Sequence, residues 1–516
     1  MPRLSVCGIQ FSFLVKTNYL ALLCLLLSLT MAAQPISFTV SMDNPAAHYF
    51  RVVMQCHNLA GKTIDLKMPV WTPGYYQRLN FARNLDSFAV TGENGRALAW
   101  EKTDDNTWRV HSNDAATLTV AYIINTRRAF VATPFLDSTR GYISPAGVFL
   151  HPAGQLHQPV QVIIQPFRAW KNVATGLDTV AGKPFTYAAS DYDMLYDCPI
   201  LTGNLEELPP FTVSGIPHRF IAYNPGNFDK AQFTNDLKKI VKTASAIIGH
   251  IPYKQYTFIA IGPGAGGIEH ANSTTISFNG AALHSPEGRL RLLNFIAHEY
   301  FHHYNVKRIR PIELGPFDYD NGNRTKMLWV SEGLTVYYEY LILKRAGIAA
   351  EEDLFRNIRS NITAFETKTG KLHQSLAEAS YETWRDGPFG RTGDSVNKTI
   401  SYYDKGPVVG MLFDFAIRHE TNNQKSLDDV MRRLYREFYQ QKKRGFTEEE
   451  LREVVESTAG TKLDELFEYI YTTREINYRK YLAYAGLAMD SGYQLTRMQH
   501  PDALQASILK TWLGEK

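Results

Sequence analysis

The segment at residues 285–302 reads SPEGRLRLLNFIAHEYFH, and it contains the most informative motif of the chain. Its last five residues form an HExxH motif, in which His298 and His302 stand four positions apart. On a helix this spacing sets both imidazoles on one face, while Glu299 lies about 100° round the axis, beside a metal without ligating it. That arrangement is typical of zinc hydrolases.

The residues around the motif predict that it lies on a mostly buried helix. Ser285, Pro286 and Glu287 have the pattern of an N-cap, a first-turn proline and a first-turn acid. Apolar residues then recur at helical spacing up to a stop near Pro311, at Leu290, Leu293, Ala297 and Phe301. The additional His303 falls one position off the ligand face, so we expect it either to support the ligands or to face the substrate.

A catalytic zinc ion needs a third protein ligand and one open position, so another buried element must supply an acid or a histidine. We predict that this ligand is Glu332, in the stretch LWVSEGLTVYYE at residues 328–339. Glu332 follows an apolar run and stands where a second helix is expected to begin. The helix dipole alone also favours an acid in a first turn, so the assignment depends on the pairing with the HExxH motif.

Several stretches together resemble the glycyl aminopeptidase family of gluzincin metallopeptidases, whose catalytic fold is related to thermolysin. They are HEYFHHYNVKRIRP at 298–311, LGPFDYD at 314–320, the stretch at 328–339, GGIEH at 266–270 and WTPGYY at 71–76. In addition, YYDKG at 402–406 is similar to the tyrosine-bearing segment that follows the third ligand in zinc aminopeptidases. The resemblance covers roughly residues 36–486 and implies Zn²⁺ as the cofactor.

Two catalytic roles follow for residues of these stretches. We expect Glu299 to act as the general base, which takes a proton from the attacking water and passes it to the leaving amine. The resemblance implies that Tyr403 donates a hydrogen bond to the developing oxyanion, with the adjacent Tyr402 as the alternative. The chain contains 29 tyrosines, so a pair of tyrosines by itself more often reflects packing.

Glu269 is the residue that would separate an aminopeptidase from an endopeptidase. An aminopeptidase needs a fixed negative group that binds the substrate's free ammonium. Glu269 lies between two strand-like runs and follows Gly266 and Gly267, where an edge strand and its loop would let the substrate backbone approach closely. Clustered glycines usually indicate only a turn, and the zinc motif favours the functional interpretation.

Three functions therefore compete. The first is a zinc aminopeptidase that acts on peptides with a free N-terminus, and the resemblance alone implies small terminal residues, glycine or alanine. The second is a thermolysin-like zinc endopeptidase, which would not need Glu269. The third is an exported binding protein with a vestigial metal site, and the intact Glu299 argues against it.

The composition of the chain does not indicate a nucleic-acid partner. The 516 residues include 55 basic and 51 acidic ones, and removal of Arg3 and Lys16 with a leader leaves 53 basic residues against 51 acidic ones. There is no basic tract and no phosphate-binding loop to favour such a partner. Hydrophobic residues make up 44% of the chain and charged residues 21%, which is ordinary for a globular protein.

Residues 1–33 have the pattern of a signal peptide. Two basic residues accompany an apolar run, and Met31-Ala32-Ala33 offers small residues for cleavage before Gln34. We expect export to the periplasm or the extracellular space, with an uncleaved anchor as the alternative and no membrane span in the mature chain. The mature chain keeps Cys56 and Cys198, which either form one disulfide or remain buried thiols.

The mature chain is predicted to be an α+β multidomain protein. Short β-branched or aromatic runs indicate an all-β, sandwich-like domain at 34–209, with strands at 38–42, 49–54, 120–124 and 160–164. A thermolysin-like catalytic domain follows at 210–345, and a helical domain at 346–480. The expected helices lie at 228–248, 351–367, 427–439 and 448–457.

The last predicted unit is a short C-terminal segment at 481–516. Many relatives of the resembled family carry a PDZ domain near the C-terminus. Only about 30 residues follow Gly486, fewer than such a domain needs. We therefore expect the PDZ domain to be missing or reduced.

Overall fold

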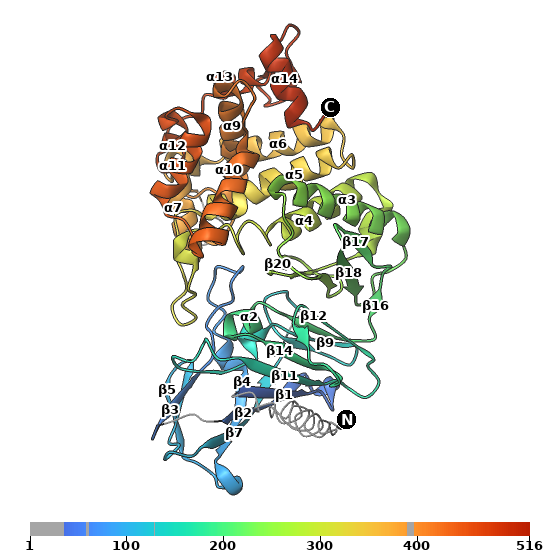
Figure 1. Ribbon diagram of the computed structural model, residues 1–516, viewed down its shortest axis with the longest axis vertical. Helices are drawn as coiled ribbons and strands as arrows, with labels where there is room; N and C mark the ends of the chain where they lie inside the picture. The colour runs from blue at the N-terminus through green and yellow to red at the C-terminus, as the bar shows by residue number, and fades with distance from the viewer. Residues whose placement is uncertain (1–35, 58–60, 128, 390–396, 516) are drawn as a thin grey trace, which may run out of the picture.

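The computed structural model describes residues 36–57, 61–127, 129–389 and 397–515, so the predicted signal peptide lies outside the described residues. Figure 1 shows a β-rich N-terminal region at one end, a helical C-terminal region at the other, and a smaller sheet with helices α3 (Lys230–Ile248) and α4 (Pro286–Phe301) between them. The predicted α+β class is confirmed. None of the described helices is long and apolar enough to cross a membrane.

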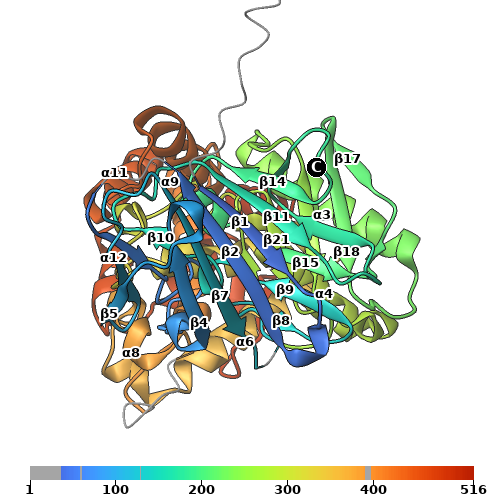
Figure 2. The same cartoon turned by 90° about the horizontal axis from the view of Figure 1, so that it is seen from below.

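A seven-stranded sheet dominates the N-terminal region, and Figure 2 shows its strands side by side. Its order is β13-β14-β11-β1-β2-β7-β4, and its strands span Ile36–Ser41 (β1), Tyr49–His57 (β2), Leu85–Thr91 (β4), Thr117–Asn125 (β7), Val160–Gln165 (β11), Asp178–Thr179 (β13) and Thr186–Ala189 (β14). Buried and partly exposed residues alternate along β1 and β7, because successive side chains of a strand point to opposite faces. The four strands predicted from the sequence correspond to β1, β2, β7 and β11.

Two four-stranded sheets share the hydrophobic core of the large sheet. One has the order β10-β3-β6-β5, with strands His151–Pro152, Ile64–Lys67, Thr107–Val110 and Trp100–Asp104. The other has the order β12-β15-β9-β8, with strands Asn172–Thr175, Ile200–Gly203, Arg140–Ile143 and Phe135–Leu136. The short helix α2 (Tyr192–Tyr196) lies between β14 and β15 in the chain. Cys56 and Cys198 are both free, buried thiols of this core.

The central sheet has the order β16-β18-β19-β21-β20, and β17 pairs with β18. Its strands span Glu206–Glu207 (β16), Phe211–Val213 (β17), Ile216–Ala222 (β18), Tyr256–Ala260 (β19), Gly267–Glu269 (β20) and Ser273–Ile276 (β21). β18, β19 and β21 run parallel, whereas β20 is an antiparallel edge strand. Since β16 already pairs with β18, the central sheet begins a few residues before position 209.

Capping residues define the two helices beside the central sheet. α3 follows Asp229, whose side chain accepts a hydrogen bond from the Gln232 amide. α4 follows Ser285, whose hydroxyl accepts a hydrogen bond from the Gly288 amide, as the N-cap pattern predicted. The helix ends at Phe301, ten residues before the expected stop, because His302 and the residues after it form turns.

The C-terminal region is built round α9 (Tyr402–Glu420), which is buried along nearly its whole length. The other helices are α5 (Leu334–Arg345), α6 (Glu351–Glu366), α7 (Leu376–Tyr381), α8 (Thr383–Asp386), α10 (Leu427–Leu434), α11 (Glu448–Ala459), α12 (Asp464–Tyr471) and α13 (Tyr478–Tyr484). The helix expected at 427–439 is α10 continued by a π-helix over Tyr435–Lys442. Thr447 and Glu450 form the predicted capping box of α11.

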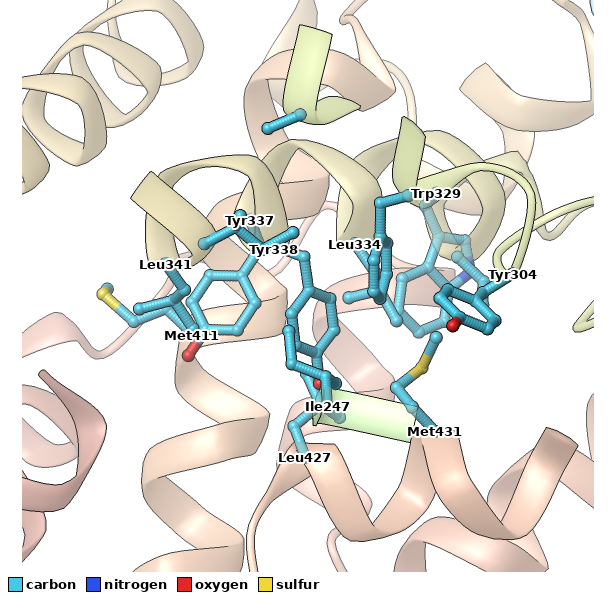
Figure 3. Close-up of a cluster of buried hydrophobic side chains, with 14 of the residues drawn as sticks. Ile247, Tyr304, Trp329, Leu334, Tyr337, Tyr338, Leu341, Met411, Leu427 and Met431 are labelled. Carbon is cyan, nitrogen blue, oxygen red and sulfur yellow. The ribbon is translucent and has the colours of Figure 1, made fainter. Parts of the chain in front are cut away.

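One hydrophobic core joins the central region to the C-terminal helices. Figure 3 shows Ile247 of α3, Tyr338 of α5, Met411 of α9 and Met431 of α10 in a single cluster of buried side chains. Burial of large apolar side chains is the dominant favourable contribution to folding. The elements that carry the metal motif are therefore fixed relative to α9 by a dry, close-packed interior.

The residues after α13 fold back onto these helices. β22 (Leu487–Met489) and β23 (Leu495–Arg497) form a hairpin, and α14 spans Ala503–Trp512. The Trp512 indole donates a hydrogen bond to the Tyr337 hydroxyl at 2.8 Å, and Arg345 donates one to the Trp512 carbonyl. The predicted C-terminal segment thus packs onto α5.

Candidate metal centre and active site

The end of α4 presents His298 and His302 side by side. Their Nε2 atoms lie 2.9 Å apart, and both residues are buried. The Nδ1 atom of His298 hydrogen-bonds to the Glu339 carboxylate at 2.8 Å, and that of His302 to the Asn305 carbonyl at 2.6 Å. A carbonyl oxygen only accepts, so Nδ1 of His302 carries the proton and its Nε2 atom is left with a lone pair for a metal.

Glu332 approaches both imidazoles from the turn before α5. Its Oε2 atom lies 3.6 Å from Nε2 of His298 and 3.3 Å from Nε2 of His302. The turn spans Trp329–Gly333 and is π-helical. This conformation is rare in proteins, and where it occurs it is often found at a functional site. Glu332 stands in the first turn of a helix, as expected, but this turn is π-helical and continues into α5, which begins two residues later.

The three side chains fit a tetrahedral zinc ion. Zinc bonds to nitrogen and oxygen are about 2.0 to 2.2 Å long, so tetrahedral ligand atoms lie roughly 3.3 Å apart. The three separations here are 2.9, 3.3 and 3.6 Å. Two imidazoles and one carboxylate are also the donor set of a catalytic zinc site that keeps its fourth position open.

The charges of the cluster support the same assignment. Burial disfavours the protonated form of His298, but hydrogen bonds to Glu332 and Glu339 outweigh it and raise the pKa of the imidazole. Burial also acts to raise the pKa of Glu332, but the two histidines outweigh it and hold this pKa well below its usual range. Glu332 is thus an anion that stabilises positive charge between the imidazoles, and a metal ion competes with protons for the same atoms.

Two glycines allow α9 to cross the π turn. A Cβ atom on Gly333 would lie 2.6 Å from the Cα atom of Gly406, and a Cβ atom on Gly406 would lie as close to Gly333. This approach brings the first turn of α9 to the ligands, and the Tyr403 hydroxyl donates a hydrogen bond to Oε2 of Glu332 at 2.9 Å. The adjacent Tyr402 is 1% exposed, and its hydroxyl pairs with that of Thr383 at 3.0 Å. The geometry favours Tyr403 over its neighbour.

Glu299 lies against the edge strand β20. A Cβ atom on Gly267 would collide with the Glu299 carboxylate, so a larger residue at this position would displace that side chain. Glu299 is 5% exposed, and its Oε2 atom has no hydrogen-bond partner among the described residues. Burial raises the pKa of its carboxyl to about 8, although the charges of His298 and His302 act in the opposite direction.

Glu269 stands two positions after Gly267 on β20, so both residues face the same side of the strand. Glu269 is 4% exposed, and its Oε1 atom has no hydrogen-bond partner within the described ranges. Gly74 of the N-terminal region closes against it, because a Cβ atom there would lie 2.8 Å from Oε2 of Glu269. Gly74 has a φ of 93° and Gly266, in the turn before β20, a φ of 91°, values that glycine adopts readily.

The N-terminal region supplies a further tyrosine to the site. Tyr76 lines a pocket together with Pro73, Gly74, Glu269, Val306, Lys307, Leu314 and Phe317. Burial raises the pKa of Tyr76, and the nearby charges of Glu332 and Glu269 raise it further. The stretch WTPGYY drew attention by resemblance, but no local pattern assigned Tyr76 a role or placed it beside two carboxylates from other elements.

Glu339 and Asn305 were also missed by the sequence analysis. Glu339 had a signal that could have found it, since it stands two helical turns after Glu332 and so points to the same side. Asn305 had none, because it acts through its backbone carbonyl. Both residues orient a ligand imidazole, and partners of this kind tune metal affinity.

His303 does not face the substrate. It is completely buried, and neither ring nitrogen has a hydrogen-bond partner in the described part of the chain. Its ring packs against those of Tyr253, Tyr256, Tyr300 and Tyr304. Burial holds its pKa well below the usual value, so the imidazole is neutral. The expectation of a substrate-facing His303 is wrong, because aromatic side chains from α4, from the turn after it and from residues 253–256 surround this position.

Two protein-family models match this chain, one in the N-terminal region and one over the metal site. Residues 37–204 match the Peptidase M61 N-terminal domain, and residues 291–409 match the M61 glycyl aminopeptidase family. No curated protein matches the chain. A solved structure of an aminopeptidase N family protein from Idiomarina loihiensis is similar with a TM-score of 0.83 and 25% identity, over 88% of this chain and 79% of that chain.

A more distant structure shares the fold. An M1 zinc metallopeptidase from Deinococcus radiodurans is similar with a TM-score of 0.51 and 12% identity, over 86% of this chain and 94% of that chain. A mutant of the M1 zinc metallopeptidase from this organism has been solved with a Tyr-Ser-Ala substrate.

The two family matches together span more than half of the chain. The second match contains the three side chains of the zinc cluster together with Glu299 and Tyr403. Family membership and the geometry of the cluster thus agree on the cofactor and on the type of reaction. The chain belongs to the M61 glycyl aminopeptidase family and is a zinc metallopeptidase of the aminopeptidase type.

Proposed function

We propose that the chain is an exported aminopeptidase that removes a small terminal residue, glycine or alanine, from peptides with a free N-terminus. The observation that carries the proposal is the buried Oε1 atom of Glu269, which lacks a hydrogen-bond partner among the described residues. A buried carboxylate without a partner is costly unless a ligand provides one. The ammonium group of a peptide N-terminus is a matching partner.

His298, His302 and Glu332 would hold the zinc ion. When bound, zinc polarises the scissile carbonyl and lowers the pKa of a water molecule in its open position. The hydrogen bonds from Nδ1 of each histidine hold the imidazoles in place for this task.

Glu299 is proposed as the general base. Its carboxylate receives a proton from the attacking water and delivers that proton to the nitrogen of the leaving amine. The Oε2 atom of Glu299 is free of hydrogen bonds to the described residues, which supports this role. Glu269 is close enough to influence the Glu299 carboxyl, so the ammonium site and the base lie within one active site.

Tyr403 is proposed as the donor that stabilises the oxyanion of the transition state. Its hydroxyl already points at Glu332, and therefore at the metal cluster. Burial and the charge of Glu332 raise its pKa well above the usual value, so the hydroxyl keeps its proton and remains a donor.

Two further observations support the preference for small residues and the export of the enzyme. The close packing of Gly74 against Glu269 supports the first, because it leaves little room beside the ammonium site. The pattern of residues 1–33 supports the second. Mass spectrometry of the protein recovered after expression in a secreting host tests export, and we expect a mature chain that begins at Gln34.

One assay tests the activity. Glycine and alanine peptides should be hydrolysed in the free form and resist hydrolysis when N-acetylated, because acetylation removes the charge that Glu269 binds. Equal hydrolysis of both forms would refute the aminopeptidase proposal and favour a thermolysin-like endopeptidase.

A further inference from the structure

The pocket beside Glu269 contains a lysine that does not pair with it. Lys307 lines the same pocket as Glu269. An ammonium group at this position would neutralise Glu269 if the two charges met. Instead, Nζ of Lys307 lies 2.7 Å from Oδ1 of Asp197. The two side chains are 8% and 17% exposed, so solvent and salt screen this ion pair only weakly.

Asp197 is anchored to the loop that carries Glu269. Its Oδ2 atom accepts a hydrogen bond from the Ala271 amide at 2.8 Å, and its Oδ1 atom lies 3.2 Å from Nδ1 of His270. Asp197 itself directly follows α2 of the N-terminal region. One carboxylate therefore connects the N-terminal region, the loop after β20 and the segment after α4.

We propose that Asp197 is a positioning residue for substrate binding, because it holds Lys307 away from Glu269 and leaves the Glu269 carboxylate unpaired for the ammonium group of the substrate. The inference rests on the proposed aminopeptidase function and deepens it. It explains how the buried Oε1 atom of Glu269 stays without a hydrogen-bond partner among the described residues in a pocket that also contains a lysine.

The pKa shifts of Asp197 and Lys307 are consistent with this ion pair. Burial acts to raise the pKa of Asp197, but Lys307 and His270 outweigh it and hold this pKa well below the usual range. Burial acts to lower the pKa of Lys307, but Asp197 and then Glu269 outweigh it and raise this pKa. The Lys307 ammonium thus lies in the field of both carboxylates, but it contacts only that of Asp197.

Replacement of Asp197 by asparagine tests the idea with little change of shape. The asparagine carbonyl still accepts the hydrogen bond from the Ala271 amide, but the charge that holds Lys307 is lost. Lys307 then turns to Glu269, which lines the same pocket. A substrate must displace this internal ion pair before its own ammonium can bind, so its apparent affinity falls.

The experiment compares the wild type with Asp197→Asn and with the double variant Asp197→Asn/Lys307→Met. For hydrolysis of alanine p-nitroanilide, we expect Asp197→Asn to raise KM by about tenfold or more, the factor that corresponds to 1.4 kcal/mol. The value of kcat should change much less, because the bound substrate has already displaced Lys307. The double variant lacks the competing ammonium, so its KM should return close to the wild-type value.

Asp191→Asn is the matched control. Asp191 caps α2, the helix that Asp197 directly follows, and asparagine caps a helix as well as aspartate does.

Zinc content and the melting temperature of each variant separate binding from folding. A wild-type KM in Asp197→Asn would overturn the proposal. A folded, zinc-loaded double variant whose KM stays as high as that of Asp197→Asn would also overturn it, because Asp197 would then support binding by another route. If Asp197→Asn does not fold, the double variant is compared with the wild type instead, and a KM about tenfold or more above the wild-type value would overturn the proposal.

The wild-type assay distinguishes failure of the proposed aminopeptidase function from failure of the proposed role of Asp197. If the wild type hydrolyses free and N-acetylated substrates equally well, the proposed function fails and this inference fails with it. If the wild type requires a free N-terminus but Asp197→Asn binds substrate normally, the proposed function stands and only this inference fails.

Discussion

The catalytic region and the N-terminal region contribute to one active site in different ways. The catalytic region supplies His298 and Glu299 from the end of α4, His302 from the residue that caps this helix, and Glu332 from one π turn. The N-terminal region supplies Gly74 and Asp197, which are far apart in the chain and reach Glu269 or its loop only through docking on the central sheet. Local spacing thus places the zinc ligands, whereas docking shapes the surroundings of Glu269, the proposed ammonium site.

The largest effect should come from loss of a ligand in the catalytic region. We expect His302→Ala to lose stoichiometric zinc and all measurable hydrolysis, because two remaining ligands do not form a catalytic zinc site. Metal analysis of the purified variant and a peptide hydrolysis assay measure both effects, and a chelator should likewise inactivate the wild type. His157→Ala, at an exposed position of the N-terminal region, is the control and should keep both properties. Undiminished zinc in His302→Ala would contradict the ligand assignment.

Next in size is the removal of the base without removal of the metal. Glu299→Gln keeps the shape of the side chain, so we expect full zinc content and a kcat lower by about 10² to 10⁴. Glu287→Gln, in the exposed first turn of the same helix, should leave kcat unchanged. Turnover like that of the wild type in Glu299→Gln would mean that another group accepts the proton.

Variants of the two neighbouring tyrosines of α9 distinguish a catalytic role from a packing role. Tyr403→Phe should lower kcat by about 10²-fold with little effect on KM, as expected for an oxyanion donor. Tyr402→Phe should lose only the hydrogen bond to Thr383, which costs about 1 kcal/mol of stability. Steady-state kinetics and thermal unfolding of both variants measure these effects. The opposite pattern would show that Tyr402 is the donor.

A substitution in the N-terminal region tests whether that region shapes recognition. Gly74→Ala places a methyl group against the Glu269 carboxylate, so we expect kcat/KM for free peptides to fall by about tenfold, or 1.4 kcal/mol. Gly154→Ala is the matched control, because Gly154 also has a positive φ, but a Cβ atom added there would meet nothing within 4 Å. If both variants lose the same activity, backbone strain and not contact with Glu269 is responsible.

The smallest effect should be a pH dependence of stability that both regions share. Burial lowers the pKa of His151, in the N-terminal region, and of His218, on β18, to about 4. Below pH of about 6.5 the unfolded chain takes up protons that the folded chain does not, so the free energy of unfolding falls between about pH 6.5 and 4. Urea unfolding at several pH values measures this slope. His218→Gln should make the slope shallower, and an unchanged slope would exclude His218 as a contributor.

The parts of the fold that could be predicted are those governed by short-range geometry. The alternation along β1 and β7 and the caps of α4 and α11 follow from neighbours a few residues apart, and the structure confirms them. The π conformation of the turn at Glu332 was not predicted, because no local pattern of residues marked it; in the structure this turn packs closely against Gly406, which lies far along the chain. His303 was misplaced for the same reason, since the rings of Tyr253 and Tyr256 that pack against it come from another part of the chain.

Local sequence was sufficient to predict the zinc motif and to single out Glu299 and Glu332, because helical spacing places His298 and His302 together with Glu299 beside them, and an apolar context favours a buried acid at Glu332. Tertiary structure decided which tyrosine reaches Glu332, how the N-terminal region closes on Glu269, and why Lys307 pairs with Asp197. These contacts join side chains separated by many tens of residues. Their distances depend on how sheets and helices pack, and no local pattern of residues encodes that packing.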